Sequence, residues 1–351
     1  MRVVVVGASG NVGTSLLDAL AREERVESVL GVARRPVELE VPKVEWAQAD
    51  VTSSELAPLF KGADAVVHLA WLIQPSRDPA RLRRVNVDGS ARVFRAVAEA
   101  RVKSLVYASS VGAYSPGPKD RRVDESWPVA GVGTSFYGRH KAAVESLLDR
   151  FEREHPKTRV VRLRPGLVFK REAASGIRRL FAGPFVPSPL LRPELLRLVP
   201  DVPGLRAQAV HSRDVGDAYR LAVVGDARGA FNVAAEPVLD AHEVARAVGA
   251  RTVRVPAAAA RVAVAASYRL RLQPSEPGWI DLALNVPLLD TTRAERELGW
   301  RPQRSSIDAL LELIEGMREG AGIETPPLAS DAGGPLRSEE LLTGVGAREL
   351  P

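Results

Sequence analysis

The sequence predicts an α/β protein built on a doubly wound parallel sheet, with a smaller C-terminal subdomain. The chain opens with a continuous apolar run over residues 2–6, which is typical of a parallel strand buried on both faces. Strand-like and helix-like patterns then alternate up to residue 164, which favours parallel strands whose connecting helices cover both faces of the sheet. After Pro165 the pattern changes, and this change marks the start of the subdomain.

The first half supplies the sheet and its helices. Strands are expected at residues 2–6, 27–33, 44–47, 65–69, 104–109 and 158–164. Helical periodicity falls at residues 14–22, 54–60, 79–100 and 135–153.

The second half is less regular. Residues 170–206 are dense in proline, arginine and leucine, so we expect an irregular segment there. Residues 208–224 return to a strand and a helix, and residues 230–233 give another short strand. Two last helices are expected, one over 293–298 that ends at Gly299 and an amphipathic one over 307–317.

Composition narrows the class of protein. The chain has 351 residues, 45% of them hydrophobic, which suits a folded globular protein. It contains no cysteine, which excludes disulfides and thiolate chemistry and is compatible with a reducing cytoplasm, where we expect the protein. The net charge is +6, but without a basic stripe interleaved with aromatics we predict no nucleic-acid partner. The Ala/Val-rich stretch 255–267 contains Arg261 and is too short to span a bilayer, so we predict no membrane segment.

A glycine-rich turn follows the first strand directly. Gly7, Gly10 and Gly13 give the spacing G-x-x-G-x-x-G, between a buried strand and a helix. Missing side chains let a backbone approach a pyrophosphate, and a helix N-terminus favours its negative charge. The turn therefore predicts a Rossmann-type dinucleotide-binding domain.

A second constellation carries acid–base chemistry. Tyr137 and Lys141 are four residues apart, so on a helix they share one face. A nearby ammonium favours phenolate, so we expect Lys141 to lower the pKa of Tyr137 from about 10. Ser110 would hold the substrate oxygen; the adjacent Ser109 would face the other way on a strand end.

With these motifs in view, the chain resembles the extended short-chain dehydrogenase/reductase family of NAD(P)-dependent epimerases, dehydratases and reductases. The resemblance covers roughly residues 1–315, with the motifs in the family's order. It implies a Rossmann domain at 1–165, to which 207–225 return, and a substrate-binding subdomain at 166–206 and 226–318. Residues 319–351, rich in glycine and proline, are expected to form a flexible tail.

The resemblance also implies roles for particular residues. Ser110, Tyr137 and Lys141 match the catalytic serine and the Tyr-x-x-x-Lys motif. Cofactor contacts are implied for residues spread along the first half: Gly7, Ser9, Gly10, Asn11, Val12, Gly13, Asp50, Val51, Leu69, Ala70, Asn86, Tyr137, Lys141, Pro165 and Val168. For Asn86, a helix kink or a packing role is an equally good interpretation.

The end of the second strand predicts which cofactor is preferred. A carboxylate there would bind the ribose 2′-hydroxyl of NAD, whereas arginine accommodates the 2′-phosphate of NADP. Arg34 and Arg35 stand at this position. Because guanidinium matches phosphate geometry, we predict NADP(H) over NAD(H), with stacking of Arg34 on adenine as the alternative.

The resemblance implies hydride transfer between the nicotinamide and a substrate carbon. Tyr137 would pass the proton, Lys141 would also hold the nicotinamide ribose, and Ser110 would bind the substrate oxygen. The leading interpretation is an NAD(P)-dependent oxidoreductase acting on a carbonyl or alcohol carbon of a small molecule. Val111-Gly112 replaces the Asp-Glu pair of dehydratases, which disfavours dehydration.

Two other functions stay open. A nucleotide-sugar epimerase is the first, although Leu167 stands where such epimerases often carry asparagine. A non-catalytic NAD(P)-sensing protein is the second, although sensors tend to lose the tyrosine. We predict no metal site, a structural role for His68 and none for His140 in the chemistry. A homodimer through helices 79–100 and 135–153 is one expectation, and a monomer the other.

Overall fold

The computed structural model describes residues 1–181, 197–330 and 345–347. The strands are β1 (Arg2–Val6), β2 (Ser28–Ala33), β3 (Val44–Gln48), β4 (Ala65–His68), β5 (Ser104–Ala108), β6 (Arg122–Val123), β7 (Arg159–Pro165), β8 (Leu167–Phe169), β9 (Leu198–Asp201), β10 (Ala209–His211), β11 (Gly229–Val233), β12 (Arg251–Arg254) and β13 (Leu288–Leu289). The α-helices are α1 (Asn11–Ala21), α2 (Ala57–Phe60), α3 (Pro79–Arg83), α4 (Gly89–Glu99), α5 (Phe136–Glu154), α6 (Ala174–Phe181), α7 (Ser212–Val224), α8 (Ala241–Val248), α9 (Ala257–Arg269), α10 (Gly278–Asn285) and α11 (Ser306–Glu319). Short 3-10 or π segments are η1 (Arg84–Asp88), η2 (Val111–Ala113), η3 (Arg171–Ala173) and η6 (Ala294–Leu298).

The central sheet has seven strands in the order β11-β7-β5-β4-β1-β2-β3, all paired in parallel. The chain therefore winds outward from β1 in both directions, which confirms the predicted doubly wound sheet. In such a sheet ligands bind at the carboxyl ends of the strands, where the winding direction changes. The turns after β1, β2 and β4 meet at that edge.

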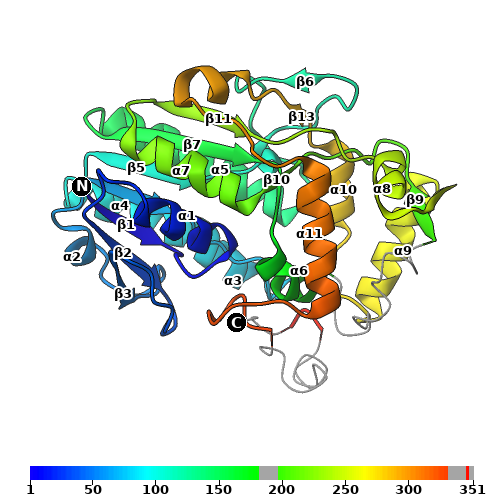
Figure 1. The fold of residues 1–351 in the computed structure, drawn as a ribbon, viewed down its shortest axis with the longest axis horizontal. Helices are drawn as coiled ribbons and strands as arrows, with labels where there is room; N and C mark the ends of the chain where they lie inside the picture. The colour runs from blue at the N-terminus through cyan, green and yellow to red at the C-terminus, as the bar shows by residue number, and fades with distance from the viewer. Residues whose placement is uncertain (182–196, 331–344, 348–351) are drawn as a thin grey trace.

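Each face of the sheet has its own core, because successive side chains of a strand point to opposite faces. Val3 and Val5 of β1 pack with α1 and α7, and Trp300 is buried in this core. Val4 and Val6 pack on the other face with α2, α4 and α5. Figure 1 shows the helices on the two faces of the sheet.

The second half of the chain adds β11 to the sheet and α7 to the core on one of its faces, and several of its other elements lie away from the sheet. In Figure 1, α8, α9 and β9 lie at the end of the molecule opposite β3. Two-stranded parallel pairs, β10-β8, β12-β9 and β13-β6, link segments distant in sequence. None of the helices in the described ranges is long and apolar enough to cross a membrane.

Three expected helices differ in extent. The helix expected at 14–22 begins at Asn11, because the glycine-rich turn contributes its last residues to the first helical turn. The helix expected at 54–60 begins only at Ala57, because hydrogen bonds between Asp50 and Ser54 hold a turn before it. The helix expected at 79–100 contains the π segment η1, where Asn86 bonds to both backbone groups of Leu72 at 2.7 Å.

Two expected irregular regions contain structure. Within 170–206, residues 174–181 form α6 and residues 198–201 form β9, while 182–196 lie outside the described residues. Within the expected tail 319–351, Thr325, Leu328 and Val345 are buried, and Arg179 of α6 donates to two carbonyls of this segment. Residues 331–344 and 348–351 lie outside the described residues. Thr325 and Leu328 of the expected tail thus pack against the rest of the protein.

Candidate active site

The glycine turn holds the backbone closer to its neighbours than any side chain would allow. Gly7 has φ +87°, and a Cβ there would lie 2.6 Å from the Ala70 nitrogen. A Cβ on Gly13 would lie 2.4 Å from the Ala8 carbonyl oxygen. Helix α1 begins directly after Gly10, which gives it no side-chain cap. The first N–H groups of α1 are thus available to an anion, as a dinucleotide pyrophosphate requires.

A groove runs over this turn along the carboxyl edge of the sheet. Its lining includes many of the residues predicted to bind a cofactor: Gly7, Ser9, Gly10, Arg34, Arg35, Asp50, Val51, Leu69 and Ala70. The remaining predicted residues lie outside this lining: Asn11, Val12, Gly13, Asn86, Tyr137, Lys141, Pro165 and Val168. Asn11 nevertheless ties the turn to the C-terminal half, because its amide donates to the Val168 carbonyl at 3.1 Å.

The groove also has walls that sequence reasoning missed. Trp71 and Leu72 follow Ala70 into it, and Pro326 and Pro327 reach it from near the end of the chain. No pattern in the sequence pointed to the two prolines, because their place depends on how the C-terminal segment crosses the fold. The residues present, a close-approach turn, an uncapped helix start and two arginines, fit a dinucleotide.

The structure brings Ser110 and Tyr137 together. Ser110 precedes η2, Tyr137 lies in the first turn of α5, and the serine hydroxyl hydrogen-bonds to the phenol. A Cβ on Gly112 would lie 2.8 Å from the Tyr137 ring, so glycine allows this approach. The hydroxyl of Ser109 points away and donates to Glu145 at 2.5 Å, which leaves Ser110 as the serine beside the tyrosine.

Lys141 lies on the same side of α5, but its ammonium points elsewhere. Its Nζ donates to the Ala108 carbonyl at 2.6 Å and lies 3.6 Å from the centre of the Trp71 ring. The distance from Nζ to the centre of the Tyr137 ring is 5.7 Å. Trp71 also lines the groove, so Lys141 contacts a residue of the groove wall without being part of the lining itself.

The expectation that Lys141 lowers the pKa of Tyr137 is wrong. Burial raises the pKa of Tyr137 to about 12, opposed by the hydrogen bond from Ser110. Burial likewise lowers the pKa of Lys141 to about 7, opposed by the charge of Glu145. Both shifts have the same cause, because a water-poor site disfavours the charged form of each group. The tyrosine is therefore held as a neutral phenol.

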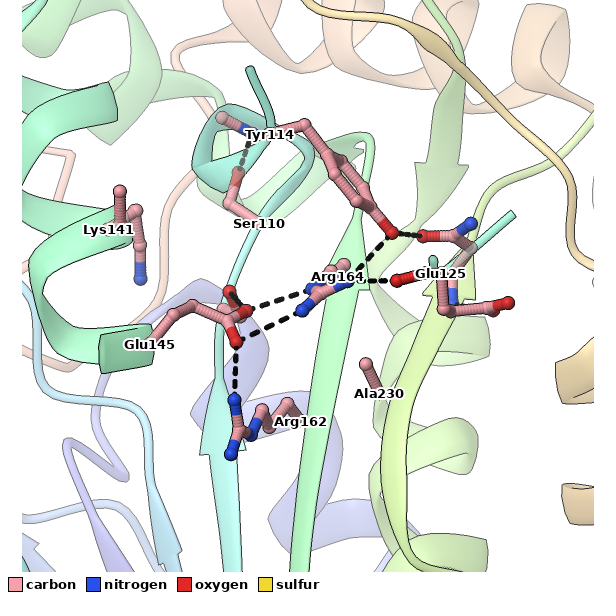
Figure 2. A network of polar contacts seen from close by, with 12 residues as sticks. Ser110, Tyr114, Glu125, Lys141, Glu145, Arg162, Arg164 and Ala230 are labelled. Carbon is pink, nitrogen blue, oxygen red and sulfur yellow. Dashed lines mark hydrogen bonds and ion pairs between the residues drawn. The ribbon is translucent and has the colours of Figure 1, made fainter. Parts of the chain in front are cut away.

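A network of buried charges lies behind the serine and the lysine. Glu145 accepts from Arg162 at 2.9 Å and from Arg164 at 2.9 and 3.1 Å, and all three side chains are at most 7% exposed. Figure 2 shows Arg164 between Glu145 and Tyr114, whose hydroxyl accepts from it at 3.0 Å. Burial raises the pKa of Glu145, but the two arginines and Ser109 outweigh burial and hold it at about 2. The carboxylate therefore stays charged and fixes the strand end that carries Ser109 and Ser110.

The sequence contained a signal for this network. Glu145 follows Lys141 by one helical turn, and Arg162 and Arg164 alternate with apolar residues in an otherwise buried strand. Charges at buried positions are retained only when they are paired. The pairing partner itself could not be chosen without the fold.

The histidines lie outside this chemistry. His68 is buried, its Nε2 lies 2.9 Å from the Ser90 hydroxyl, and burial with the charge of Lys141 lowers its pKa to about 3. His140 packs against Phe136, with its ring centre 5.8 Å away. Across residues 1–181, 197–330 and 345–347, no three His, Asp or Glu side chains are grouped so that they could hold a metal ion.

Comparison with known proteins agrees with this geometry. The model of the NAD dependent epimerase/dehydratase family matches residues 3–182. An uncharacterised protein of Mycobacterium tuberculosis is 23% identical over 327 residues, which cover 90% of this chain and 83% of that protein. The decarboxylating sterol-4-alpha-carboxylate 3-dehydrogenase of Candida albicans is 27% identical over 256 residues, 68% of this chain and 65% of that enzyme.

Among solved structures, MoeE5 in complex with UDP-glucuronic acid and NAD has a similar fold. Its TM-score is 0.66 at 24% identity, and the match covers 91% of this chain and 99% of that one. The family match spans the glycine turn, the groove lining except Pro326 and Pro327, and the Ser110, Tyr137 and Lys141 positions. The chain therefore belongs to the NAD dependent epimerase/dehydratase family and is an enzyme with a nicotinamide cofactor.

Proposed function

We propose that the protein is an oxidoreductase that interconverts a carbonyl and an alcohol on a small molecule, with NADP(H) preferred. The observation that carries this proposal is Trp71, which lines the dinucleotide groove and also stacks on Lys141 beside Tyr137. Two of the acid–base residues, Tyr137 and Lys141, thus contact a residue that lines the cofactor groove. A relative named as a 3-dehydrogenase supports the same class of reaction.

In the reducing direction, a bound nicotinamide supplies the hydride that adds to the carbonyl carbon. Tyr137 gives its phenolic proton to the carbonyl oxygen, and its pKa of about 12 keeps that proton in place until the substrate takes it. Ser110 donates to the same oxygen as negative charge develops there. Lys141 holds the ribose and, once turned from the Ala108 carbonyl, stabilises the phenolate left on Tyr137.

Arg34 and Arg35 support the cofactor preference. Both line the groove and follow β2 directly, which ends at Ala33. They stand at the position where an NAD enzyme would carry a carboxylate. A 2′-phosphate would meet two guanidinium groups there. The ratio of kcat/KM for NADPH to that for NADH tests the preference. A ratio above about 10 that collapses in an R34S/R35S variant is expected, and a preference for NADH would contradict it.

A nucleotide-sugar epimerase is the second candidate, because a protein of similar fold is solved with UDP-glucuronic acid and NAD. The two candidates differ in cofactor balance. An oxidoreductase consumes one NADPH for each carbonyl reduced, whereas an epimerase returns its hydride and leaves the absorbance of the reduced nicotinamide unchanged. A carbonyl and nucleotide-sugar panel, read by that absorbance and by product analysis, decides between them.

A further inference from the structure

Aromatic rings surround the Tyr137 phenol on the side of the C-terminal subdomain. Trp279 of α10 lies with its ring centre 5.0 Å from that of Tyr137, tilted by 39°. Trp71 meets the same tyrosine edge-on at 5.8 Å. Phe181, at the end of α6, meets Trp279 edge-on at 5.0 Å. The ring that carries the acid–base hydroxyl therefore belongs to an aromatic cluster.

Hydrogen bonds join the three segments that supply these rings. The Gln74 amide donates to the Leu180 carbonyl at 3.1 Å, which ties the loop after Trp71 to the end of α6. Ser275 donates to the Phe181 carbonyl at 3.1 Å, and Ser76 donates to the Pro274 carbonyl at 2.7 Å. The loop after β4, the end of α6 and the segment before α10 thus form one wall, and the rings are held in place by it.

Tyr137 and Trp279 also pack against aliphatic side chains. The cluster includes Val111, Val132, Leu282 and Val286. This composition favours binding of apolar surface, because aromatic and aliphatic side chains gain most from contacts that remove such surface from water.

Three cations of α5 and α6 bond to backbone carbonyls. Arg139 of α5 donates to the Gly133 carbonyl at 2.6 Å. Arg179 of α6 is buried and donates to the carbonyls of Pro327 and Ala329. Lys141 donates to a backbone carbonyl, as described above. A diphosphate would require cations facing the substrate, whereas these face carbonyl groups.

We propose that the substrate beside Tyr137 is an apolar carbonyl compound, or its alcohol, whose ring system packs against Trp279 and Trp71. This proposal rests on the proposed oxidoreductase function and names its substrate class. The reacting carbon lies next to the Tyr137 hydroxyl, and the rest of the molecule lies along the aromatic wall. Trp279 is then a specificity-determining residue, because it contacts the part of the substrate that does not react.

The test is a series of saturated ring ketones with the same carbonyl and increasing size: cyclohexanone, decalone and perhydrophenanthrenone. With NADPH-loaded protein we expect kcat/KM to rise roughly tenfold for each added ring, from the apolar area that each ring buries. In W279A the rise in kcat/KM should fall to roughly threefold or less per ring, whereas W279F should keep most of the wild-type rise. W46F, at the outer strand of the sheet, is the matched control and should leave the series unchanged.

The outcomes separate this proposal from the proposed function. UDP-glucose and UDP-glucuronic acid are assayed alongside, and turnover of either at a higher kcat/KM than the ketones overturns the substrate class. A flat wild-type series, or a W279A series as steep as wild type, also overturns it.

A binding measurement covers the case in which no ketone is turned over. The affinity of decalol for NADP⁺-loaded protein is measured by calorimetry. If decalol binds to wild type and roughly tenfold more weakly to W279A, the substrate class stands and the proposed reaction falls. If decalol does not bind, the substrate class falls as well. Circular dichroism and the NADPH Kd establish that each variant is folded. If W279A does not fold, the substrate class is tested by comparing W279F with wild type.

Discussion

Replacing Glu145 by glutamine should destabilise the protein strongly. The carboxylate accepts hydrogen bonds from Ser109, Arg162 and Arg164, and its side chain is only 2% exposed. Glutamine keeps the shape but removes the charge, so buried Arg164 loses its carboxylate partner, whereas Arg162 keeps Asp149 and Glu152. Breaking a buried ion pair by removing one partner costs about 3–5 kcal/mol.

The pKa of Glu145 gives an independent magnitude. A carboxyl group whose pKa falls from 4.5 in the unfolded chain to about 2 in the folded one contributes about 3 kcal/mol at neutral pH. Because the folded-state pKa is the lower one, this contribution is complete above the unfolded value of 4.5 and is lost as pH falls towards 2. The difference in stability between wild type and E145Q should therefore shrink over the same interval.

The assay is urea unfolding followed by circular dichroism at several pH values. The matched control is D149N, because Asp149 accepts from the same Arg162 at 2.6 Å but is 56% exposed. An exposed pair contributes about 1 kcal/mol or less, so D149N should lose far less stability than E145Q. A loss below about 1 kcal/mol in E145Q, or equal losses in both variants, would refute the reasoning.

Three further predictions concern the site. Tyr137→Phe should lower kcat by roughly 10²–10⁴ because the proton donor is lost, with an unchanged NADPH Kd in fluorescence titration; unaltered turnover would exclude the tyrosine as acid. Gly13→Val should abolish NADPH binding, because even a Cβ there would lie 2.4 Å from the Ala8 carbonyl oxygen; a calorimetric Kd within about twofold of wild type would contradict this. Arg179→Met should leave the carbonyls of Pro327 and Ala329 without their donor, which should lower stability by about 1–3 kcal/mol. It should also speed NADPH release, measured by stopped flow. Unchanged release would show that the segment around Pro327 does not hold the cofactor.

The sheet could be predicted because its information is local. The apolar run at 2–6, the glycine spacing and the strand–helix alternation each determine the structure of a short segment. Connections between parallel strands are almost always right-handed, so these segments can be arranged in only a few topologies. The expectation that Ser110 and Tyr137 act together came from the family resemblance, and the two residues lie close together after β5 and at the start of α5.

What the sequence did not supply depends on tertiary contacts. The expected effect of Lys141 on Tyr137 was reasoned from spacing alone, whereas the ammonium turns to the Ala108 carbonyl and the Trp71 ring. The π segment at Arg84–Asp88 interrupts the helix expected at 79–100, because Asn86 bonds to the backbone of Leu72, which lies in another segment. The sequence likewise indicated that Arg162 and Arg164 are buried charges, but not that Glu145 is their shared partner.

The place of Pro326 and Pro327 in the groove has a consequence for biosynthesis. During synthesis the glycine turn leaves the ribosome well before Pro326 and Pro327, which supply one wall of the groove. A chain that has not yet reached these prolines lacks that wall. The lining of the groove is therefore completed only after the segment that carries the two prolines has been made.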